Sequence, residues 1–177
     1  LVLSLTCSAA TLADPADVEL TWSASGDPST PLVFNPADFG DTIIGEDGSQ
    51  QFVGSRTGAS WQLGWTTTAR QDAEQAFLDG TISIINLSDE AQDFSLQTAL
   101  LLNTTIVDPR DVALSASLAL TNLQWIGGAS VTSAAGDSLI TGLLDDTPVA
   151  RVFDAPYVLS TSAPFGSASD TESSAAL

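Results

Sequence analysis

Apolar and polar residues alternate along most of this chain, and short clusters of Gly, Pro, Asn and Asp interrupt the alternation. Segments 18–23 and 60–66 are clear examples, because each places its Trp and Leu residues on one face. A period of two residues is typical of a β-strand with one buried face. The pattern therefore predicts roughly nine or ten such strands, separated by turns.

Two-faced strands belong to antiparallel sheets that have one side against a core and the other side in water. We therefore predict an all-β fold, an antiparallel β-sandwich of jelly-roll or immunoglobulin-like two-sheet architecture. Segments 80–86 and 92–100 are predicted to pair as a hairpin around the polar turn at 88–90. The alternation breaks over 69–77, where Ala, Gln and Glu indicate either a short helix or a strand followed by a loop.

The chain has 177 residues, a length that suits a single domain. Residues 1–13 are uncharged and apolar up to Ala13, and Asp14 follows, which is typical of the end of a secretory signal peptide without its basic start. An apolar first strand is the alternative for this segment. We expect one sandwich domain over 14–165. The Ser- and Ala-rich segment 166–177 is expected to be a flexible tail, because it offers little apolar surface to bury.

Acidic residues dominate the charge: 22 Asp and Glu face four Arg, and the net charge is −18 without any Lys or His. Binding a phosphate backbone needs cationic side chains, so nucleic acid is excluded as a partner. Without His and Lys, imidazole-based nucleophile pairs and Schiff bases are excluded as well. After residue 13 no stretch approaches the ~18 apolar residues that cross a bilayer, so no membrane span is expected in the mature chain.

Carboxylate pairs and cations bound by oxygen are the chemistries that this composition leaves open. Asp145 and Asp146 are the candidate metal ligands, for calcium, although a carboxylate in a turn usually accepts a backbone N–H or faces water. Trp125 and Tyr157 are the candidate ligand-binding residues, as aromatic side chains that can stack on a sugar. The other Trp residues stand among aliphatic residues at alternating positions and are predicted to lie in the core. No catalytic residue is assigned, and calcium is the one candidate cofactor.

Several runs in the second half resemble a known class of exported proteins. They are Gly80–Asn86, Ile140–Ala150, Phe153–Tyr157 and Ala163–Ser167. Their order over residues 77–167 is similar to that in secreted β-rich bacterial proteins that carry a sorting anchor of the PEP-CTERM kind. The anchor itself, a Pro-Glu-Pro motif with an apolar helix and a basic end, does not occur after Ser167. The resemblance implies export and a surface role, and no catalytic residue carries over from it.

These features predict a non-catalytic structural or interaction domain that is secreted or lies at the cell surface. Its expected partner is a polysaccharide or protein of the extracellular matrix or surface. One alternative is a calcium-braced carbohydrate-binding module built on Trp125 and Tyr157. Another is a carboxylate-only glycoside hydrolase, which requires two facing carboxyl groups roughly 5 to 10 Å apart.

Overall fold

The computed structural model divides the chain into two compact units, unit 1 (Leu1–Asp108) and unit 2 (Pro109–Leu177). The range 14–165, predicted to be one domain, thus spans both units. The physical reason is strand pairing: among the described residues, every sheet draws its strands from one unit alone. The described residues are 16–71, 76–101, 113–123, 127–144, 147–162 and 164–174, so the predicted signal segment 1–13 lies outside them.

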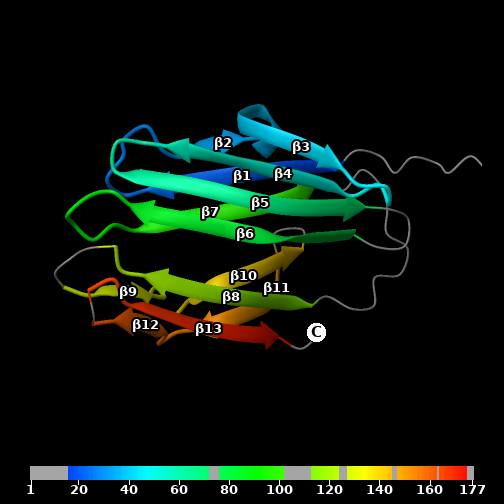
Figure 1. Cartoon of the computed structure of the whole chain (residues 1–177). Coiled ribbons are helices and arrows are strands. Elements are labelled where there is room, and N and C mark those ends of the chain that lie inside the picture. Colours follow the sequence, from blue (N-terminus) through cyan, green and yellow to red (C-terminus); the bar gives the residue numbers. More distant parts are fainter. Residues whose placement is uncertain are drawn as a thin grey trace, which may run out of the picture. The chain divides into compact units, whose positions relative to one another are not determined.

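Unit 1 consists of a three-stranded and a four-stranded antiparallel sheet (Figure 1). The first sheet has the order β2-β1-β7, with β2 at Leu32–Phe34, β1 at Asp17–Ala24 and β7 at Phe94–Leu101. The second has the order β3-β4-β5-β6, with β3 at Gly40–Ile44, β4 at Gln50–Thr57, β5 at Trp61–Gln71 and β6 at Ala76–Asn86. A short 3-10 helix, η1 (Pro36–Phe39), connects β2 to β3. The predicted all-β class with antiparallel sheets is confirmed.

The core of unit 1 contains side chains from both sheets. Trp22 and Leu20 of β1 form one cluster with Trp61 and Trp65 of β5, and all four are almost fully buried. The rings of Trp22 and Trp61 lie 5.2 Å apart, centre to centre. Burying side chains of this size contributes about 1.5–3 kcal/mol each. The alternation of the sequence thus identified the buried face of β1 and β5 correctly.

The predicted hairpin in the middle of unit 1 is wrong. Segments 80–86 and 92–100 do not pair with each other, because β6 pairs with β5 while β7 pairs with β1 in the other sheet. Of the two alternatives for 69–77, the described residues follow the strand rather than the helix, since Ala69 to Gln71 end β5 and Ala76 begins β6. The pairing of β5 with β6 along their full length outweighs the local helical preference of Ala, Gln and Glu.

Trp61 makes a buried polar contact between β5 and the turn that follows β1. Its indole Nε1 donates to Asp27 Oδ2 at 2.8 Å, from β5 to the turn between β1 and β2. Asp27 Oδ1 also accepts from the hydroxyl and the backbone N–H of Ser29, at 2.6 and 2.9 Å. Gly58 makes room for this contact, because a Cβ there would lie 2.4 Å from Trp61 Nε1 and 2.7 Å from Asp27 Oδ2.

Hydrogen bonds lower the pKa of Asp27 below its ordinary value of 3.8. Those from Ser29 have the larger effect, and the one from Trp61 has a smaller effect. A carboxyl group with a lowered pKa stabilises the folded state at pH values above its ordinary pKa. That stabilisation is lost as the pH falls through the lowered pKa. Unit 1 is therefore expected to lose stability in acid through this group.

The other two indoles in the core differ from Trp61. Nε1 of Trp22 and Nε1 of Trp65 are buried without a hydrogen-bond partner among the described residues. A buried donor without a partner costs about 1–3 kcal/mol relative to the same group in water. Trp61 and Trp65 are therefore suited to comparison. Both are buried on the same face of β5, but only the indole N–H of Trp61 has a hydrogen-bond partner among the described residues.

The described residues of unit 2 form three antiparallel pairs of strands. They are β8 (Leu114–Thr121) with β13 (Ser167–Ser174), β9 (Ala129–Thr132) with β12 (Val158–Thr161), and β10 (Ser138–Leu144) with β11 (Thr147–Asp154). The prediction of a flexible tail over 166–177 is wrong for 167–174, because β13 pairs with β8 along all eight of its residues. The backbone pairing of β13 orders a segment whose side chains are mostly exposed.

We predict that Trp61→Phe destabilises unit 1 more than Trp65→Phe does. Both substitutions remove the same atoms, but only Trp61→Phe removes a hydrogen bond and leaves Asp27 without its buried donor, whereas Trp65→Phe removes a donor that had no partner. The melting temperature of Trp61→Phe should be lower by about 5 °C. Thermal unfolding followed by circular dichroism measures this difference. Equal melting temperatures would contradict the role given to the Asp27 contact.

Candidate functional site

Of the predicted site residues, Tyr157 alone lies in the described part of the chain. Trp125 lies outside the described residues, as do Asp145 and Asp146. Tyr157 stands between a cis Ala155–Pro156 peptide bond and the start of β12, and it is half-buried. The candidate site is therefore built around Tyr157.

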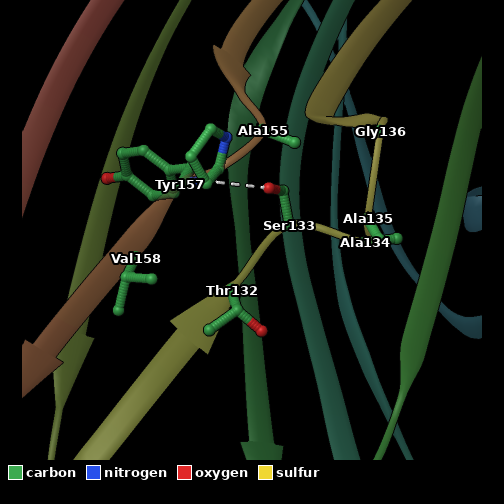
Figure 2. Close-up of a pocket in the computed structure, with 9 residues that line it drawn as sticks. Thr132, Ser133, Ala134, Ala135, Gly136, Ala155, Tyr157 and Val158 are labelled. Carbon is green, nitrogen blue, oxygen red and sulfur yellow. Dashed lines mark hydrogen bonds between the residues drawn. The ribbon is translucent and has the colours of Figure 1, made fainter.

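Tyr157 borders an open pocket between two turns of unit 2 (Figure 2). One turn follows β9 and includes Gly136 at a φ of 79°, a backbone conformation that favours glycine. The other turn joins β11 to β12. The pocket is lined by Thr132, Ser133, Ala134, Ala135, Gly136, Ala155, Pro156, Tyr157 and Val158. Short side chains and one aromatic ring thus form its walls.

Tyr157 is fixed in place through both its backbone and its side chain. Its backbone N–H donates to Ser133 Oγ at 3.2 Å, and its carbonyl accepts from the Ser133 N–H at 3.2 Å. Its phenol donates to Asp170 Oδ2 at 3.1 Å, and its ring lies 4.8 Å from the ring of Phe153. An aromatic ring held in this way needs little further ordering to contact a ligand.

Two carboxylates of β13 accept hydrogen bonds from Phe153 and Tyr157. Asp170 and Glu172 stand two residues apart and pair with Leu118 and Ala116 of β8, so both lie on the face that carries the half-buried residues of β8. Glu172 Oε2 accepts from the backbone N–H of Phe153 at 2.6 Å. Phe153 is buried at a φ of 58°, which is strained for an aromatic residue, and the carboxylate satisfies its N–H there.

The sequence analysis missed Asp170 and Glu172 because it assigned them to a flexible tail. Their spacing of two residues was the available signal, since it places both side chains on one face of a strand. Segment 167–174 has no large apolar residues at alternating positions, so this spacing alone is weak evidence for a strand. The strand is recognisable only together with β8, its partner about fifty residues earlier in the chain.

Burial raises the pKa of the Tyr157 phenol above its ordinary value of 10.0, and the Asp170 hydrogen bond and the charges of Asp170 and Glu172 raise it further. The phenol is therefore neutral and acts as a hydrogen-bond donor at neutral pH. A raised pKa stabilises the folded state below pH 10, and this contribution is lost as the pH rises through the raised pKa.

The pocket offers groups that can contact a ligand. The residues that line the pocket include the aromatic Tyr157 and two residues with hydroxyl groups, Thr132 and Ser133. A ring of this kind can stack on an apolar ligand face, and the hydroxyl groups can exchange hydrogen bonds with it. Within the described residues, no three Asp, Glu or Cys side chains gather as a metal-binding group.

Comparison with known proteins adds nothing to this geometry: no family model, no curated protein and no solved structure matches the chain. In the described part of the chain, no helix is both long enough and apolar enough to span a bilayer.

We predict that the phenol of Tyr157 titrates above pH 10 in the folded protein and that Asp170→Asn brings its pKa closer to 10. Removing the carboxylate removes the acceptor and one of the charges that oppose ionisation. Tyr157 is the only tyrosine of the chain, so the absorbance change at about 295 nm reports this residue alone. Asp137→Asn, an exposed change at the neighbouring turn, is the control and should leave the titration unchanged.

Proposed function

We propose that this protein is a non-catalytic interaction domain that works outside the cell or at its surface, through contacts with matrix or surface polysaccharide or protein. The distribution of its side chains is the observation that supports the proposal. Large aromatic residues fill the core of unit 1, whereas acidic residues cover the outside of both units. The exposed acidic residues are Asp17, Asp38, Asp41, Glu46, Asp47, Asp79, Asp89, Glu90, Asp93, Asp137, Asp154, Asp170 and Glu172.

An acidic exterior keeps copies of the protein apart, so that the surface stays available for contacts with other molecules. Copies of a strongly acidic protein repel each other, which keeps the protein soluble at high local concentration. The same charge repels anionic polymers and favours neutral or cationic ones. We therefore expect the ligand to bind where exposed apolar side chains are surrounded by acidic residues.

A carbohydrate-binding module is the second candidate function, and the pocket at Tyr157 favours it. The aromatic ring and the hydroxyl groups of Thr132 and Ser133 provide the two kinds of contact that a neutral sugar makes. Calcium bound at Asp145 and Asp146 belongs to this candidate as a brace for a loop. A carboxylate-only glycoside hydrolase is the third candidate, and it differs from both in releasing new sugar ends.

Co-sedimentation tests the three candidates together. The purified protein is mixed with extracellular matrix from cells that make it, and both the bound protein and the released reducing sugar ends are measured. We expect the protein to sediment with the matrix and the reducing ends to stay constant. Protein that remains in the supernatant would contradict the proposal, and a rise in reducing ends would favour the hydrolase.

A matched pair of variants separates the first two candidates within the same assay. Tyr157→Phe keeps the ring and loses the phenol, whereas Tyr157→Ala loses both. If the pocket binds sugar by stacking, Tyr157→Ala should lower binding by about tenfold or more, and Tyr157→Phe should retain most of it. If both variants sediment like the unmodified protein, the interaction surface lies elsewhere.

A further inference from the structure

We propose that the outer edge of β3 binds an extended, basic segment of a partner protein, which adds to the sheet of unit 1 as a further strand. The inference rests on the proposed interaction role and names the kind of partner. β3 is the terminal strand of its sheet and pairs with β4 on one side only among the described strands (Figure 1). An edge strand of this kind offers unpaired backbone groups to an incoming strand.

Apolar side chains are exposed on both faces of β3. All five of its residues are exposed, and Ile43 and Ile44 are exposed by 54% and 72%. The two side chains point to opposite faces because they are consecutive residues of a strand. A strand that covers a core has one buried face, so β3 presents more apolar surface than its place in unit 1 requires. A strand placed beside it would cover part of both isoleucines.

The register of the hairpin identifies the backbone groups that face outward. The Gly45 N–H donates to the Ser49 carbonyl at 2.8 Å, which makes these two residues a hydrogen-bonded pair. In an antiparallel ladder such pairs recur at every second residue, so Ile43 and Asp41 also direct their backbone groups toward β4. Thr42 and Ile44 therefore direct their N–H and C=O groups away from the sheet, where a partner strand can pair with them.

The charges around β3 select a basic partner. Asp38, Asp41, Glu46 and Asp47 are exposed in and beside the strand. Arg70 forms an ion pair with Asp47 at 3.6 Å, whereas Asp38, Asp41 and Glu46 have no ion pair among the described residues. A second copy of β3 would bring the same carboxylates face to face, which is unfavourable. A segment that alternates Arg or Lys with apolar residues would complement both the charge and the isoleucines.

Binding of a synthetic peptide to the full chain tests the proposal. The probe is a fluorescent peptide that alternates Arg and Val, and the control peptide has Glu in place of Arg. Fluorescence anisotropy should show binding of the Arg peptide alone, and the affinity should fall as salt is added. Equal binding of the two peptides, or binding of neither, would overturn the proposal. Neither result would change co-sedimentation with the matrix, so failure here is distinct from failure of the proposed function.

Variants of β3 locate the binding. Thr42→Pro removes an outward N–H and keeps the pairing with β4, so it should weaken peptide binding by about tenfold, while Thr42→Val should not. Asp41→Asn should weaken binding at low salt, and Asp79→Asn, the same change on β6 at the other edge of the sheet, should not. Unchanged binding by both Thr42→Pro and Asp41→Asn would overturn the assignment to β3. A dimer of the unmodified chain in sedimentation velocity that Thr42→Pro dissociates would show instead that a second copy occupies the edge.

Discussion

The hydrogen bond from the Trp61 indole to Asp27 is the interaction on which the arrangement of unit 1 depends. Burial of apolar surface drives the two sheets together, but it has no direction and tolerates many relative positions. A hydrogen bond between a buried donor and a carboxylate has a direction, and separating the two groups leaves the Trp61 N–H without a partner and removes one of the donors to Asp27. The contact joins β5 to the turn between β1 and β2, so it fixes the two sheets at the point where the tryptophans meet.

Carboxylates have a similar structural role in unit 2. Glu172 accepts the N–H of the strained residue Phe153, and Asp170 accepts the phenol of Tyr157. In both units, acidic residues thus accept hydrogen bonds from donors that the fold would otherwise leave unpaired. Asp170 and Glu172 therefore both stabilise the fold and contribute negative charge near the pocket at Tyr157.

The sequence predicted those parts of the fold that depend on one strand at a time. Alternation identified the all-β class and the buried face of β1 and β5, including Trp22, Trp61 and Trp65. The alternation did not predict which strands pair when the two partners are far apart in the sequence. β7 joins β1 rather than β6, and β13 is ordered by β8 although its own residues bury little. For the same reason Tyr157 was recognised as a candidate from its residue type, while its partners Asp170 and Glu172 were not.

Hydrogen exchange of the indole N–H groups, followed by NMR on the full chain in D2O, tests the central claim that the tryptophans of unit 1 form its interior and leave the acidic exterior for contacts. The account predicts that the indole signals of Trp22, Trp61 and Trp65 persist long after exposed amides have exchanged, because these side chains exchange only when unit 1 opens. Exchange of these indoles as fast as that of a free indole would place them at the surface and contradict the account.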